Sequence, residues 1–125
     1  MNYLMVKMVH VTGLGLTFMG LAGVLAAKMA GEGTFKKRRA FHLAHGLGLL
    51  LLIGTGIIMV AQMKQWGGMN PLPGWIKAKL GIWLLAGGAM GLAVRFGTSR
   101  YASLLLIFFA VLVALAAWLA ITKPF

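Results

Sequence analysis

The run LLLIFFAVLVALAAWLAI at residues 104–121 decides the fold class of this protein. It contains no ionisable side chain. An unbroken apolar run of about 18 residues or more is typical of a helix that crosses a bilayer, whose hydrocarbon core is roughly 30 Å thick. The run therefore predicts a transmembrane helix rather than a strand or the core helix of a soluble domain.

Three further apolar runs resemble it in length, at about 4–27, 41–63 and 75–94. The segments between the runs are short and are polar or rich in turn-forming residues. Short connections place neighbouring helices antiparallel. The sequence therefore predicts an all-α membrane protein with one transmembrane domain over residues 1–125. Its four helices, with the last at about 102–121, would form an up-down bundle.

The charge balance points to membrane lipid as a partner. Hydrophobic residues make up 61% of the chain and charged residues 10%, whereas soluble domains carry about 25% charged residues. Twelve Lys and Arg face a single acid, Glu32. Membrane proteins gather basic residues in loops, where they set orientation and contact anionic lipid, so nucleic acid is not implied. The lack of cysteine excludes disulfides and iron–sulfur clusters.

The basic residues also predict an orientation. Most of them fall at one end of the expected bundle, and loops rich in Lys and Arg stay in the cytoplasm. We therefore expect an integral protein of a bacterial inner membrane with both termini outside. The residues on the expected cytoplasmic side are Lys28, Lys36, Lys37, Arg38, Arg39, Arg95 and Arg100. Against them stand Lys64 and Lys123 on the other side, with Lys7, Lys77 and Lys79 at or inside helix ends.

Ionisable residues at membrane depth are candidates for function, because burying them is costly. His10 in the first run and Lys79 in the third both lie roughly 6–9 Å below the outer edge. Met59 and Met63, near the end of the second run, lie at a similar level. We expect one layer that holds His10, Lys79 and either Met59 or Met63. Either they serve a site, or His10 is hydrogen-bonded to a neighbouring helix and Lys79 extends its ammonium to the interface.

His42 and His45 belong to the opposite end, after the KKRR run. Their i, i+3 spacing puts them on one helix face. His10 would lie about 13 residues, or roughly 20 Å, from the level of His45, so the two cannot ligate one haem within a protomer. His42 and His45 are expected to be interfacial, or to contact propionates or lipid phosphates together with Arg38 and Arg39.

Imidazole in an apolar four-helix bundle is a ready axial ligand for haem iron, and methionine is a known partner for it. Because no acid lies within the helices, a site for a bare divalent cation is less expected. The sequence therefore makes haem b the expected cofactor. His10 and Lys79 are the candidate iron ligands, and Met59, His42, His45 and Arg39 are further candidates for cofactor contacts.

Two segments resemble a known family. YLMVKMVHVTGLGLTFMG (3–20) and GWIKAKLGIWLL (74–85) resemble the first and third helices of the oxygen-independent protoporphyrinogen oxidases of the HemJ type. Membrane proteins of the CopD type share a looser version of the first segment. The resemblance implies haem b held by His10 and Lys79. It also implies an oxidoreductase that takes electrons from a tetrapyrrole precursor and passes them to a quinone or a respiratory partner.

Three functions are therefore considered from the sequence. The first is a haem-binding redox protein, either with protoporphyrinogen oxidase activity or passing electrons without it. The second is a structural or assembly subunit whose histidines pack the bundle, and the third is a small transporter. Four thin helices would not fully enclose a haem, so a homo-oligomer is also expected, with His42 and His45 meeting across its two-fold axis.

Overall fold

A computed structural model of the chain contains four helices and describes residues 2–31, 35–65, 73–96 and 101–122, with the side chains of 35–38, 64, 65 and 96 excepted. The helices are α1 (Tyr3–Met29), α2 (Phe35–Gln65), α3 (Gly74–Phe96) and α4 (Ala102–Thr122). The predicted all-α fold is confirmed, and no strand occurs among the described residues. Each helix is long and apolar enough to cross a membrane.

Local sequence explains several of the helix ends. The Asn2 side chain caps α1 by accepting from the Met5 N–H at 2.8 Å, as short polar side chains commonly do. At the other end, Gly31 has φ 83° and donates its N–H to the Lys28 carbonyl at 3.1 Å. A backbone in this left-handed region favours glycine, so Gly31 permits the chain to turn just after the end of α1.

The second helix is longer than the sequence analysis expects. It begins at Phe35 rather than near residue 41, because the KKRR run continues the helix. Lysine and arginine are good helix formers, and their charges do not prevent a helix from extending past the bilayer edge. The apolar, membrane-crossing part of α2 is Arg39–Met63.

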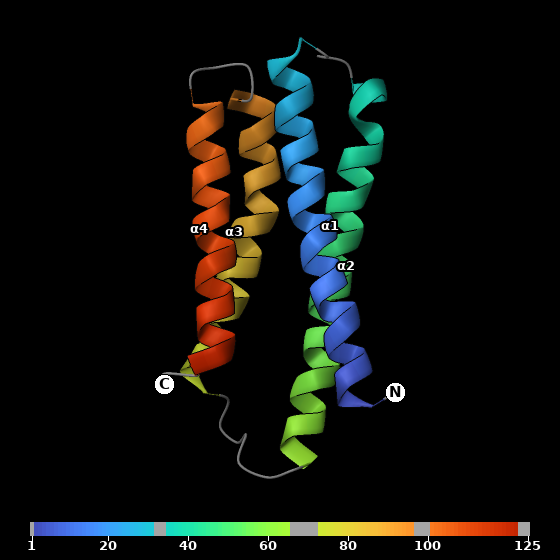
Figure 1. Ribbon diagram of the computed structural model, residues 1–125, viewed down its shortest axis with the longest axis vertical. Helices are drawn as coiled ribbons and strands as arrows, with labels where there is room; N and C mark the ends of the chain where they lie inside the picture. Colours follow the sequence, from blue (N-terminus) through green and yellow to red (C-terminus); the bar gives the residue numbers. More distant parts are fainter. Residues whose placement is uncertain (1, 32–34, 66–72, 97–100, 123–125) are drawn as a thin grey trace.

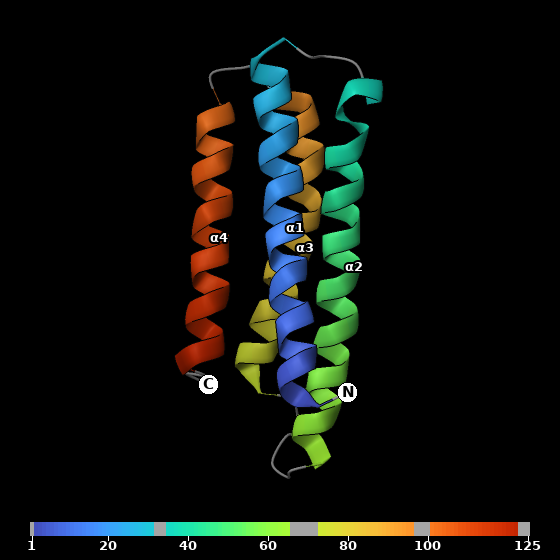
Figure 2. The same cartoon turned by 45° about the vertical axis from the view of Figure 1, so that its right-hand side comes forward.

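The helices run alternately up and down, so both chain ends lie at one end of the bundle (Figure 1). We call this the terminal end, and the opposite one, where α1 ends and α2 begins, the basic end. The contact between α1 and α2 is by far the most extensive in the bundle, and that between α3 and α4 comes second. Figure 2 shows the same arrangement from another side. The fold is therefore two helix pairs laid side by side.

Glycine allows α1 and α2 to approach closely. A Cβ placed on Gly20 would come within 2.5 Å of the His45 backbone nitrogen, and one on Gly13 within 2.9 Å of the Leu51 Cβ. Small residues allow close backbone approach in membranes. The frequent glycines at this interface therefore serve helix packing.

The two pairs meet in an apolar core near the basic end. Leu21, Val24 and Leu25 of α1 pack with Ala89 of α3 and Phe109 of α4, and Phe109 is 1% exposed. Phe18 adds a stacked ring contact to Phe109, with centroids 5.7 Å apart. This core ties α1 to the second pair and leaves the terminal half of the bundle less filled.

Candidate functional site

The imidazole of His10 is bonded across the α1–α2 interface. Its Nδ1 lies 2.7 Å from Thr55 Oγ1. The Thr55 hydroxyl donates to the Leu51 carbonyl one turn earlier, so its oxygen is left to accept from the His10 Nδ1–H. The hydrogen-bond network thus assigns the Nδ1–H tautomer, and His10 Nε2 carries a lone pair.

Lys79 lies on the face of α3 that is turned toward α2. Trp75, Lys79 and Trp83 follow one another at i, i+4 and i+8, so they share a helix face. Trp83 Nε1 donates to the Leu49 carbonyl of α2 at 2.9 Å. Trp75 is buried in a cluster with Ile76 and Leu119, and Val60 of α2 packs against that cluster. Lys79 therefore lies between two tryptophan contacts to the same helix.

These two contacts also set the level of Lys79. Trp83 meets α2 at Leu49, and Val60 of α2 packs against the cluster that contains Trp75. In an antiparallel pair, Lys79 then lies opposite the turn of α2 that carries Thr55 and Gly56. Lys79 is also near enough to His10 for their charges to interact. His10, Thr55 and Lys79 thus form one level across three helices, which we call the polar layer.

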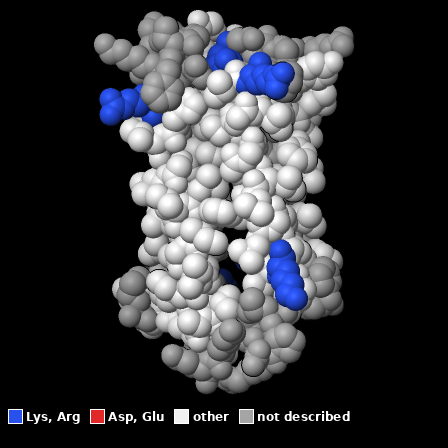
Figure 3. Space-filling view, turned by 180° about the vertical axis from the view of Figure 1, so that it is seen from behind, with Lys and Arg blue, Asp and Glu red and all other residues white. Residues whose placement is uncertain are grey.

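A hollow lies at this level. Seen from the side of α2 and α3, the surface is hollowed in the half toward the terminal end, and a basic side chain lies inside (Figure 3). Lys79, which is half-buried on the face of α3 turned toward α2, lies at this level. Gly56 contributes no side chain here, and a Cβ on it would meet only His10 Cε1, at 3.6 Å. We call this space the α2–α3 hollow.

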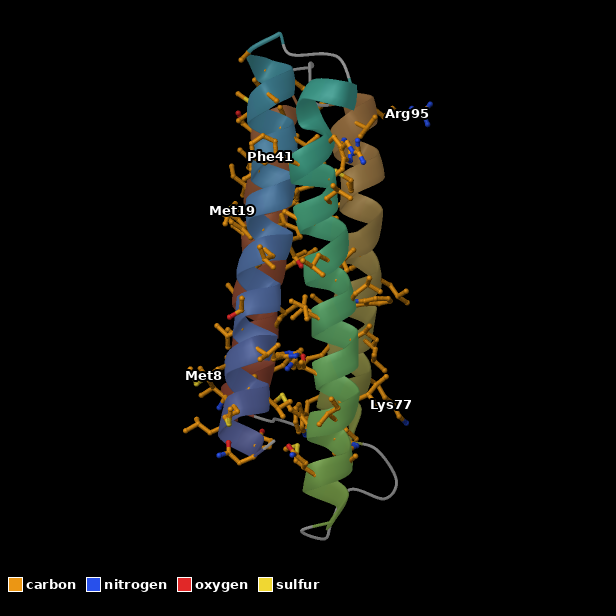
Figure 4. All side chains as sticks on the ribbon, turned by 90° about the vertical axis from the view of Figure 1, so that its right-hand side faces the viewer. Met8, Met19, Phe41, Lys77 and Arg95 are labelled. Carbon is orange, nitrogen blue, oxygen red and sulfur yellow. The ribbon has the colours of Figure 1, made fainter. Side chains whose placement is uncertain are left out.

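The other candidate residues near this level differ in position. Met59 is half-buried on α2, and Met63 packs against the Trp75 cluster. Lys77 is exposed, and its side chain points away from the bundle (Figure 4). It is therefore a surface lysine at the membrane edge, separate from Lys79.

His45 lies in the α1–α2 interface and is only 3% exposed. Its Nδ1–H donates to the Thr17 carbonyl at 2.9 Å, and its buried Nε2 has no hydrogen-bond partner. Because α1 covers His45, its imidazole does not reach the lipid-facing surface of the bundle, and its depth in a membrane stays a prediction. A dimer in which His45 meets its symmetry mate would require α1 and α2 to separate, and self-association stays a prediction.

His42 and Arg39 lie nearer the basic end. His42 is half-buried and lines a shallow apolar groove with Trp83, Gly46 and Leu50. Arg39 is exposed. His42 and His45 thus face different neighbours, although they are one turn apart. Several basic residues used for the orientation have side chains outside the described residues: Lys36, Lys37, Arg38, Lys64, Arg100 and Lys123.

A comparison with protein families gives one match. The family model of SirB, described as an invasion gene expression up-regulator, matches residues 3–124. The chain belongs to the SirB family. No curated protein and no solved structure matched it.

Membership of the SirB family corrects the resemblance to the HemJ and CopD types. The SirB model covers nearly the whole chain, whereas the two resembling segments cover residues 3–20 and 74–85. Lysine, tryptophan and glycine near helix ends occur in many membrane helices, because they anchor the interface and allow packing. The chain is therefore not assigned to the HemJ or CopD type.

For this SirB family chain, haem b stays a prediction. His10 has the tautomer that histidine ligands usually show, with Nδ1–H bonded and Nε2 available. The described residues contain no group of three or more His, Cys, Asp or Glu that could hold a metal ion.

The sequence analysis missed three residues of the site: Thr55, Gly56 and Trp83. A signal existed for Trp83, since its spacing from Trp75 and Lys79 marks one helix face. Thr55 is one of few polar residues in the second apolar run, and Gly56 is one glycine among 18. Their importance depends on the register of α1 against α2.

Proposed function

We propose that this protein is an assembly subunit of the membrane, which binds a transmembrane helix of another membrane protein through glycine-bearing faces of α2 and α3. The glycine faces carry the proposal. They are formed by Gly46 and Gly54 of α2 and by Gly81, Gly88 and Gly91 of α3.

Two sets of glycines in this bundle have contrasting surroundings. A Cβ on Gly13, Gly20 or Gly48 would collide with the neighbouring helix, so these positions are occupied by the internal packing. A Cβ on any of the five face glycines would have no heavy atom within 4 Å. Glycine on a lipid-facing surface gives the chain no packing of its own, yet it allows another helix to approach closely.

Charge favours a different protein over a second copy. The chain carries a net charge of +11, and Lys28, Arg39 and Arg95 lie toward the basic end. Two copies packed in parallel would bring these charges together, whereas a partner with an acidic segment beside its membrane helix would neutralise them. The partner is therefore expected to carry Asp or Glu next to its transmembrane helix.

The family description fits an indirect role. Members of the SirB family are described as up-regulators of invasion gene expression, while the described residues of this chain form membrane-type helices. A protein of this kind would affect gene expression through a partner rather than by contacting DNA.

Site-specific photo-crosslinking in native membranes tests the proposal. A photoreactive amino acid placed at Gly88 or Gly54 is expected to form a discrete protein adduct. The same probe at Ile107, which is 60% exposed on α4, is the matched lipid-facing control. Replacing Arg39 and Arg95 by Glu should reduce the Gly88 adduct severalfold, and identification of the adduct should show an acidic segment beside a membrane helix.

Three results would overturn the proposal. They are equal adduct yields at Ile107 and Gly88, adducts that consist of a second copy of this chain, and yields that do not change when the two arginines are reversed.

A further inference from the structure

The α2–α3 hollow plays no part in the proposed helix-docking role. The face glycines with open surroundings point outward, whereas the polar layer lies between helices. Polar groups at membrane depth are costly and usually mark a site. The chemistry of the polar layer therefore needs its own explanation.

The polar layer offers two complementary groups. Lys79 contributes an ammonium, which carries a positive charge and only donates hydrogen bonds. His10 Nε2 accepts hydrogen bonds, because the imidazole proton lies on Nδ1 and is bonded to Thr55. A ligand that contacts both groups would combine an anionic oxygen for the ammonium with a hydroxyl donor for the imidazole. A simple inorganic cation would find a lone pair at His10 Nε2 but would be repelled by the Lys79 ammonium.

The location of the hollow indicates how such a ligand would enter. The hollow opens sideways on the face formed by α2 and α3 (Figure 3), and both helices are long and apolar enough to cross a membrane. The entrance therefore faces lipid rather than water. Trp75 and Trp83 frame Lys79 along α3, and indole side chains are favoured near lipid head groups.

We propose that the α2–α3 hollow binds the head group of an anionic glycerophospholipid that also carries a hydroxyl, with its phosphate at Lys79 and its hydroxyl donating to His10 Nε2. Phosphatidylglycerol has this combination. The acyl chains would leave the hollow along the apolar surface of α2 and α3, and Gly56 leaves room for the head group.

Native mass spectrometry of delipidated protein in detergent tests this inference, with lipids added one at a time. Phosphatidylglycerol is the main probe. Phosphatidylethanol has the same charge but no hydroxyl, and phosphatidylcholine has no net charge. Free glycerol 3-phosphate separates a membrane lipid from a soluble phosphate. We expect phosphatidylglycerol to bind best, phosphatidylethanol severalfold more weakly, and the other two at background.

The variants separate the two contacts. Lys79→Gln should weaken both anionic lipids about tenfold, as expected for loss of a charge-assisted hydrogen bond. His10→Phe should remove only the preference for phosphatidylglycerol over phosphatidylethanol. Gly56→Leu should block binding by filling the hollow. Lys77→Gln is the matched control, because that exposed lysine lies on the same helix outside the hollow, and it should bind normally.

Circular dichroism of each variant checks that a loss of binding is not a loss of fold. The inference is overturned if Lys77→Gln and Lys79→Gln weaken binding equally, or if phosphatidylcholine binds as well as phosphatidylglycerol. It is also overturned if free glycerol 3-phosphate competes fully, or if the purified protein shows a Soret band that His10→Phe abolishes. The last result would assign the hollow to haem. None of these outcomes depends on the photo-crosslinking at Gly88.

Discussion

Gly48 of α2 lies directly against Thr17 of α1, so that a Cβ on Gly48 would come within 2.5 Å of the Thr17 backbone nitrogen. The Thr17 hydroxyl is turned back onto its own helix, where it donates to the Gly13 carbonyl at 2.8 Å. Two backbones thus touch where both side chains are small or internally bonded. This contact sets the register of the pair that holds His10 and His45.

Gly48→Ala should destabilise the protein. The added methyl group has no space, and overpacking of this kind costs roughly 1–3 kcal/mol. Gly46→Ala is the matched control, since a Cβ there meets nothing within 4 Å; it should be neutral or stabilising by about 0.5–1 kcal/mol, because alanine favours a helix over glycine. Thermal unfolding in detergent measures both, and equal midpoints would contradict the close contact.

The α1–α2 register can be tested by cross-linking, because the chain has no native cysteine. Gly13→Cys with Leu51→Cys should form an intramolecular disulfide once the two helices move slightly apart. The Gly13 Cβ position lies 2.9 Å from the Leu51 Cβ, closer than the about 3.5–4.5 Å of a disulfide. The control pair is Gly15→Cys with Leu51→Cys, because Gly15 has nothing within 4 Å. A mobility shift on oxidation in the control pair alone would show that the register is wrong.

His45→Leu should change stability little, by less than about 1 kcal/mol. The substitution removes a buried nitrogen without a hydrogen-bond partner, and replacing such a group by an apolar one of similar size is often neutral. The Thr17 carbonyl loses the imidazole but keeps its own helix hydrogen bond. A fall in the unfolding midpoint as large as that of Gly48→Ala would mean that His45 Nε2 has an essential partner.

Trp83→Phe should loosen the contact between α2 and α3. It removes the Nε1–H donor to the Leu49 carbonyl, worth about 0.5–1.5 kcal/mol. Trp118→Phe on α4 is the control, because Trp118 is 48% exposed. Thermal unfolding should show a lower midpoint for Trp83→Phe only.

The orientation of the chain in the membrane, predicted from its charge distribution, can be tested with fusion proteins. Alkaline phosphatase fused after the chain should be active, and green fluorescent protein at the same position should not fluoresce, if both termini lie outside. The opposite pair of results would reverse the orientation. It would also move the polar layer to the cytoplasmic half of the membrane.

The candidate site was only partly accessible from the sequence. The levels of His10 and Lys79 follow from counting residues in four alternating helices, and the structure brings these two side chains near one another. Counting also placed His10 about 13 residues from the level of His45, whereas its hydrogen bond goes to Thr55, which is ten residues from His45. This error of one turn hid Thr55 and Gly56, because the length and path of the loop between α1 and α2 are not visible in helix counts.

The sequence by itself determined that this chain forms four apolar helices in one alternating bundle, because apolar runs of bilayer length separated by short polar segments have few other stable arrangements. Only the tertiary structure decided which of its glycines are occupied by packing, that His45 is buried beneath α1, and that Lys79 lies between two tryptophans facing α2. These features depend on helix rotation and register. In a chain whose helices are apolar on every side, the hydrophobic pattern specifies neither the rotation nor the register of a helix. Close backbone contacts, such as that of Gly48 with Thr17, specify both.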